Sequence, residues 1–114
     1  MFEFQHLEVY KKAKQFYSGC QSCLRNGQFE NYVINQLGRS SLSVALNIAE
    51  GSGKFSNADR RNYFTIARAS LFECIATLDI LCDEGQITEY ELEKFQKEAD
   101  VLSRMLFTMI RNLR

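Results

Sequence analysis

Apolar residues recur at steps of three and four along most of this chain, and no stretch of useful length alternates as a β-strand would. Such steps place apolar side chains on one face of an α-helix. Four segments follow the pattern, and the chain has no proline to break them internally. The pattern therefore predicts four helices, over residues 7–25, 31–50, 57–82 and 89–112.

Short polar turns separate the four segments. Asn26-Gly27 and Asp83-Glu84-Gly85 are typical helix ends, and Thr88 with Glu91 three residues later is typical of a capped helix start. A chain of 114 residues is long enough for one hydrophobic core. Because short loops make successive helices antiparallel neighbours, the prediction is a single all-α domain over residues 1–114, an up-down-up-down antiparallel four-helix bundle.

Ten consecutive residues, Ser40 to Ala49, carry no charge. A helix at a protein surface normally has a charged face toward water, so this segment is predicted to be covered on two sides. One stripe is predicted to face the core and consists of Ile34, Leu37, Ser41, Ala45 and Ile48. A second stripe, Ser40, Ser43 and Asn47, is predicted to face either a second subunit or a neighbouring helix of the same chain.

The third segment has its own predicted core face, and an arginine lies beside it. The core face is Tyr63, Ala67, Ser70 or Leu71, Cys74, Leu78 and Leu81. Arg68 has Phe64 and Phe72 four residues to either side, so it is predicted to be partly buried and to need a partner. Glu73 is five residues away, outside the spacing at which helical side chains meet, so the partner should come from another helix.

The resulting hypothesis is a polar network, within one chain or between subunits, formed by Asn47, Glu50, Arg68, Ser70 and Glu73. The alternative is an exposed arginine whose aliphatic stem lies on the two phenylalanines. Replacement of Arg68 with leucine separates these two readings.

Charge is balanced overall, with fourteen basic and fourteen acidic residues, but it is separated along the predicted bundle. The end that holds the second turn is predicted to be basic and the opposite end acidic. Lys54, Arg60 and Arg61 lie near the N-terminus of the third segment, where helix electrostatics disfavour positive charge. A docked anion is therefore predicted there, with RNA phosphate as a candidate; the alternative is ordinary solvated surface charge.

Residues that commonly perform chemistry are sparse and badly spaced. Cys74 and Cys82 lie about 12 Å apart along one helix, so they cannot both join Cys20 and Cys23 in one zinc site. With His6 as the only histidine, no nucleophile–histidine pair or di-iron motif can be assembled. No catalytic residue, metal or cofactor is therefore expected; a carboxylate pair of Glu50 and Glu73 is the least favoured alternative.

The sequence also predicts a location. No apolar run of about 18 residues occurs, and the N-terminus lacks the basic and apolar pattern of a signal peptide. The expected compartment is the cytoplasm, without a membrane partner, and the four cysteines are expected to be reduced thiols.

Several segments together resemble the four-helix-bundle proteins of 23S ribosomal RNA intervening sequences. They are Asn47-Ile48-Ala49-Glu50-Gly51, the serine-rich approach Gln36–Ser43, the segment Ile66–Glu73 and the opening Leu7–Ala13. The resemblance implies a non-enzymatic bundle that forms a ring, typically a homopentamer. It also implies a distant relation to accessory proteins of diversity-generating retroelements, which bind nucleic acid.

Together these observations predict a non-enzymatic, self-assembling ring whose basic end is a candidate site for nucleic acid. The alternative is a structural or protein-interaction oligomer without a nucleic-acid role. A salt-dependent interaction with structured RNA distinguishes the two.

Overall fold

The computed structural model describes residues 1–114 and contains helices and no strand. The elements are a short 3₁₀ helix, η1 (Glu3–His6), and four α-helices, α1 (Glu8–Asn26), α2 (Asn31–Ser52), α3 (Asn57–Asp83) and α4 (Glu89–Asn112). The all-α class and the four predicted helices are confirmed, with ends that agree to within two residues. The sequence pattern did not predict η1.

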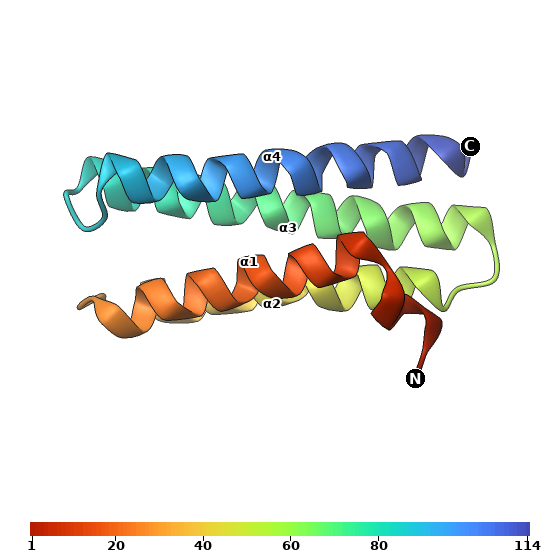
Figure 1. The fold of residues 1–114 in the computed structure, drawn as a ribbon, viewed down its shortest axis with the longest axis horizontal. Coiled ribbons are helices and arrows are strands. Elements are labelled where there is room, and N and C mark those ends of the chain that lie inside the picture. Colours follow the sequence, from red (N-terminus) through yellow and green to blue (C-terminus); the bar gives the residue numbers. More distant parts are fainter.

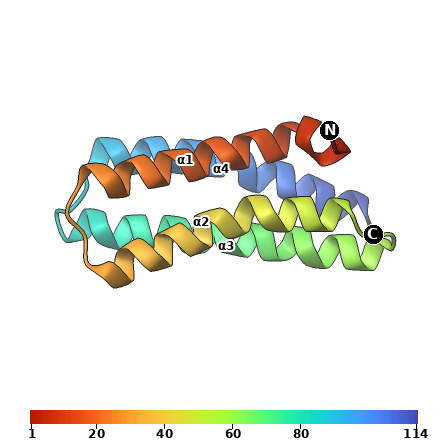
Figure 2. The same cartoon turned by 90° about the horizontal axis from the view of Figure 1, so that it is seen from below.

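The helices form an elongated bundle about 44 Å long. Consecutive helices run in opposite directions, and the packed pairs are α1–α2, α2–α3, α3–α4 and α4–α1 (Figures 1 and 2). One end of the bundle holds η1, the α2–α3 turn and the C-terminus, and the other end holds the two remaining turns. None of the helices combines the length and apolar character that a membrane crossing requires.

Local capping explains where α3 and α4 begin. The Ser56 side chain accepts a hydrogen bond from the Asp59 amide at 3.1 Å. At the start of α4, the Thr88 hydroxyl accepts from the Glu91 amide and the Glu91 carboxylate accepts from the Thr88 amide, both at 3.0 Å. These reciprocal bonds satisfy two backbone donors that the first turn of a helix leaves free.

The core runs the length of the bundle and contains side chains from all four helices. Phe16 of α1 is fully buried and lies edge-on to Phe95 of α4, with ring centroids 6.0 Å apart. In α3 the structure buries Phe64 and leaves the predicted Tyr63 half-buried, and in α2 the predicted Ile34 is exposed. No buried side-chain nitrogen or oxygen lacks a hydrogen-bond partner.

Candidate functional site

The small polar residues of α2 meet α3 in a seam, which we call the serine seam and which comprises Ser40, Ser43, Asn47, Ser70 and Cys74. The hydroxyls of Ser43 and Ser70 lie 2.9 Å apart, and Asn47 Nδ2 donates to both the carbonyl and the hydroxyl oxygen of Ser43 at 2.9 Å. The Cys74 thiol donates to Ser40 Oγ at 3.3 Å. The stripe Ser40, Ser43 and Asn47, for which the sequence left open a second subunit or a helix of the same chain, thus has hydrogen-bond partners within one chain.

Close approach of the two helices continues to the end of α2. Gly51 is buried, and a Cβ at this position would lie 2.7 Å from the Phe64 ring and 3.0 Å from Tyr63 Cβ. Only a residue without a side chain fits in that space. Phe64, and not its neighbour Tyr63, completes the core face of α3, because it lies three residues before Ala67 and seven before Leu71, on the same helical face.

The five residues of the predicted polar network do not come together within the chain. Asn47 and Ser70 are linked through Ser43, which the prediction had omitted. Glu73 instead accepts a hydrogen bond from Gln36 at 2.5 Å, and Glu50 is exposed. The physical reason is rotation: positions 68 and 70 differ by about 200° around a helix of 3.6 residues per turn, so Ser70 faces α2 while Arg68 faces α4.

Arg68 lies between two phenylalanines and has no carboxylate partner. Its Nε donates to the Ser103 carbonyl at 3.3 Å, and its guanidinium carbon lies 4.7 Å from the Phe72 centroid and 5.7 Å from the Phe107 centroid. Arg111 contacts the same Phe107 ring at 6.0 Å. This arrangement matches the alternative of an arginine resting on aromatic rings, with Phe107 of α4 in place of the buried Phe64.

The predicted anion site, Lys54, Arg60 and Arg61, lies at one end of the bundle, but its side chains have partners within the chain. Arg60 Nε donates to the Lys54 carbonyl at 2.7 Å, and Lys54 Nζ lies 5.0 Å from the Tyr63 centroid. Arg61 donates to the Leu113 carbonyl at the end of α4, where positive charge is favourable because the last carbonyls of a helix are unpaired. These arginines therefore hold the end of the bundle together.

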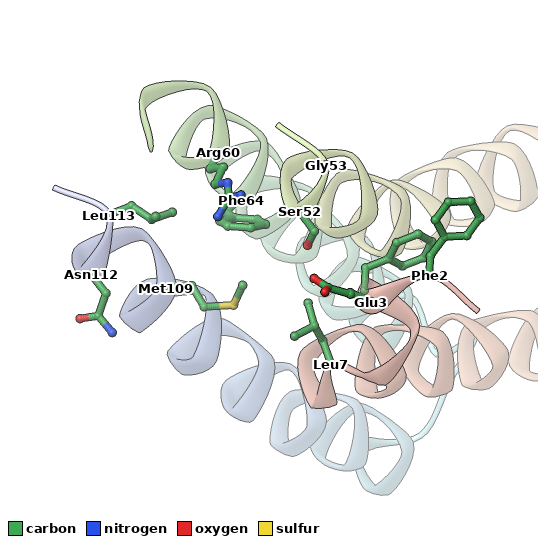
Figure 3. Close-up of a pocket in the computed structure, with 11 residues that line it drawn as sticks. Phe2, Glu3, Leu7, Ser52, Gly53, Arg60, Phe64, Met109, Asn112 and Leu113 are labelled. Carbon is green, nitrogen blue, oxygen red and sulfur yellow. The ribbon is translucent and has the colours of Figure 1, made fainter. Parts of the chain in front are cut away.

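A groove of about 590 Å³ opens at the same end (Figure 3). Its apolar lining is Phe2, Phe4, Leu7, Phe64, Met109 and Leu113, and its polar lining includes Glu3, Ser52, Arg60 and Asn112. The groove exists because η1 folds back beside the ends of α2 and α4. Sequence periodicity could not reveal it, since η1 has no helical repeat of its own.

All four cysteines are free thiols, and no three His, Cys, Asp or Glu side chains converge as a metal site would require. Cys20 and Cys74 are buried in the core. Burial raises the pKa of Cys74 from 9.0 to about 11 and raises the pKa of Cys20 strongly. The cause is desolvation, which disfavours a thiolate in an apolar interior.

We expect alkaline pH to destabilise the fold through these thiols. Above pH 9 the unfolded thiol ionises while the folded Cys74 thiol, with its pKa of about 11, stays neutral, so stability falls as pH rises through this window. One such thiol contributes a loss of about 1 kcal/mol by pH 10. Urea unfolding at pH 8 and pH 10 should show a smaller loss for Cys74→Ala than for the unmodified chain, and equal losses would contradict the assignment.

Known proteins resemble this chain in fold and in sequence. Among curated proteins, no sequence matches this chain. A crystal structure from Bacteroides thetaiotaomicron, of a protein with unknown function from the S23 ribosomal protein family, is similar at a TM-score of 0.83 and 27% identity, covering 90% of this chain and 97% of that one. The sequence profile of the 23S rRNA-intervening sequence proteins matches residues 5–108. The chain therefore belongs to the family of 23S rRNA-intervening sequence proteins.

Proposed function

We propose that this chain is a non-enzymatic, cytoplasmic helical bundle that assembles with copies of itself into a ring, as a homopentamer, and binds nucleic acid at its basic end. The pentamer is the assembly that the family resemblance implies. The observation that carries the proposal is an exposed apolar surface on the uncharged part of α2. The carboxylates considered for acid–base chemistry, Glu50 and Glu73, are both exposed on the surface.

This surface, which we call the outer α2–α3 face, comprises Leu42, Leu46 and Ile66. Leu42 is 39% exposed and Leu46 is 51% exposed, both on the side of α2 away from the core. The Ser43–Ser70 and Gly51–Phe64 contacts set the antiparallel register, which places the exposed Ile66 of α3 near the level of Leu46. Exposed apolar side chains gathered on neighbouring helices are typical of protein–protein interfaces.

We therefore propose that the subunit interface lies on a different face of α2 from the stripe Ser40, Ser43 and Asn47 considered from the sequence. Ser40 is only 4% exposed within one chain, so its side chain cannot contribute a contact area to a second subunit. Ser43 and Asn47 are half-buried and lie at the edge of the seam. Leu42 and Leu46 belong to the same uncharged segment and have no partner in the core, which favours them as the interface.

A charge at Leu46 should break the assembly. We expect Leu46→Glu to lower the particle mass measured by light scattering toward 13.2 kDa, the mass of one chain, because an unpaired charge is costly to bury at an interface. Val101→Glu is the matched control, since Val101 is similarly exposed but lies on α4. Circular dichroism verifies that both variants remain helical. Retention of the assembled mass by Leu46→Glu, or its equal loss in Val101→Glu, would overturn this interface.

Nucleic-acid binding is supported by the cations gathered at one end of the bundle, where Lys54, Arg60 and Arg61 adjoin the end of α4. A titration with structured RNA at two salt concentrations tests it, and binding should weaken as salt rises because each phosphate contact releases counterions. Absence of binding to both structured and unpaired RNA at low salt would contradict this part of the proposal.

A second candidate is an oligomer with structural or protein-binding roles alone. One observation favours it: Arg60 and Arg61 both donate hydrogen bonds to backbone carbonyls of their own chain. An assembled particle that binds no RNA at low salt would establish this alternative.

A further inference from the structure

Phenylalanine and arginine alternate on the outer side of the α3–α4 pair. The guanidinium carbon of Arg68 lies 4.7 Å from the centroid of Phe72 of α3 and 5.7 Å from the centroid of Phe107 of α4, and that of Arg111 lies 6.0 Å from the Phe107 centroid. We call these four residues the arginine–phenylalanine stripe. Because α3 and α4 lie side by side (Figure 1), the stripe bridges two helices from mid-bundle toward the C-terminal end.

Both rings are open to solvent over about half their surface. Phe72 is 54% exposed and Phe107 is 48% exposed, and neither belongs to the buried core. Burial in the core therefore does not account for aromatic residues at these positions. An exposed ring with a cation on one side offers its remaining surface to another flat group.

The cations of this face are not neutralised by carboxylates. The ion pairs within the chain join Lys11 to Glu8, Lys97 to Glu93 and Arg104 to Asp100. Arg61, Arg68 and Arg111 belong to none of them. Arg68 uses its Nε on the Ser103 carbonyl, which fixes the side chain and leaves its terminal nitrogens without a carboxylate. Asp79 and Asp100 lie beside Phe72, and Asp100 is paired with Arg104. The positive charge of this face therefore comes from Arg61, Arg68 and Arg111, toward the C-terminal end, on a chain whose net charge is zero.

An occupant of this stripe should combine flat apolar surfaces with regularly spaced negative charges. Single-stranded nucleic acid has this chemistry, because unpaired bases stack on aromatic side chains and phosphates contact arginine. In a duplex the base faces are already stacked inside the helix, and an acidic peptide lacks the repeated flat rings. Charge and ring exposure together therefore favour an unpaired strand.

We propose that the arginine–phenylalanine stripe binds single-stranded RNA, with bases stacked on Phe72 and Phe107 and phosphates on Arg68 and Arg111. This inference rests on the nucleic-acid role proposed above and gives it a surface. The strand lies along the side of the bundle, next to the end where Arg61 contacts the last turn of α4.

The test uses fluorescence anisotropy with an unstructured RNA of about 12 nucleotides, a length in the range of single-strand binding sites, and a duplex RNA of the same length. We expect the unpaired RNA to bind more tightly than the duplex. Phe72→Leu combined with Phe107→Leu should weaken binding of the unpaired strand at least about fivefold, since leucine keeps apolar bulk but loses the flat ring. Tyr90→Leu is the matched control, because Tyr90 is exposed on α4 at the opposite end.

A second pair of variants tests the charges. Arg68→Gln combined with Arg111→Gln should reduce the dependence of log affinity on log salt by about 0.7 for each lost phosphate contact. Lys97→Gln is the control, because Lys97 lies on α4 like Arg111 but is ion-paired with Glu93. It should leave the salt dependence unchanged. Light scattering on every variant verifies that the assembly is intact.

The outcomes separate this inference from the proposed function. If the unmodified chain binds neither RNA at low salt, both fail. If RNA binds but the double phenylalanine variant binds it as tightly as the unmodified chain, the stripe is overturned while the wider nucleic-acid role stands. Equal affinity for the duplex and the unpaired RNA also overturns the stripe. So does a changed particle mass in the double phenylalanine variant, because it would make this face a subunit contact.

Discussion

Replacing Phe16 with alanine is expected to lower the free energy of unfolding by about 3–5 kcal/mol. The Phe16 side chain is fully buried at the centre of the α1–α4 contact and lies edge-on to Phe95. Truncation removes the apolar burial of a whole ring, leaves a cavity and loses the edge-to-face contact. Native proteins have total stabilities of about 5–15 kcal/mol, so this loss is a large fraction of the total.

Urea unfolding at one fixed protein concentration measures this effect, because the proposed self-association would make apparent stability depend on concentration. Phe55→Ala is the control: Phe55 is fully solvent-exposed in the α2–α3 turn, and its loss should change stability by less than about 0.5 kcal/mol. Equal effects of the two substitutions would contradict the assignment of Phe16 to the core.

Replacing Gly51 with valine is expected to cost about 2–3 kcal/mol, because the new side chain would overlap the Phe64 ring and the Tyr63 Cβ. The sign is informative. Gly51 lies in the last turn of α2. Glycine is a poor helix former, so a side chain at such a helical position normally stabilises the helix or changes its stability little. Only the close contact between α2 and α3 reverses that expectation.

Gly19→Ala serves as the matched control, since a Cβ at Gly19 would lie 3.5 Å from the Phe95 ring, an ordinary contact distance. This change should raise stability by about 0.5–1 kcal/mol through helix propensity. Gly51→Ala should lose less stability in thermal unfolding than Gly51→Val, because alanine adds a smaller side chain. A gain in stability at both glycines would show that α2 and α3 do not approach as closely as described.

Helix positions were predictable because their signals are local. The apolar repeat and the turn residues gave the ends to within two residues, and the Thr88–Glu91 capping box is present as predicted. The choice between Tyr63 and Phe64 was also local. Phe64 continues the steps of three and four through Ala67, Leu71, Cys74, Leu78 and Leu81, and the structure buries it, whereas the predicted Tyr63 lies one position off that stripe.

The candidate site was less predictable, for two physical reasons. Spacing along α3 indicates which residues share a face, but it does not indicate which helix lies opposite that face. Arg68 therefore received a predicted partner from α2, whereas its aromatic partner Phe107 comes from α4, far away in sequence. The uncharged stretch of α2 likewise has two separate faces, a serine seam against α3 and a face with exposed leucines. The absence of charge alone does not distinguish these two faces.

We propose above all that this bundle works as an assembly of identical chains. The most direct measurement is the particle mass of the unmodified protein by light scattering at micromolar concentration. We expect a particle of several times 13.2 kDa, with the homopentamer as the expected size. A particle of 13.2 kDa, unchanged as the concentration is raised, would contradict it.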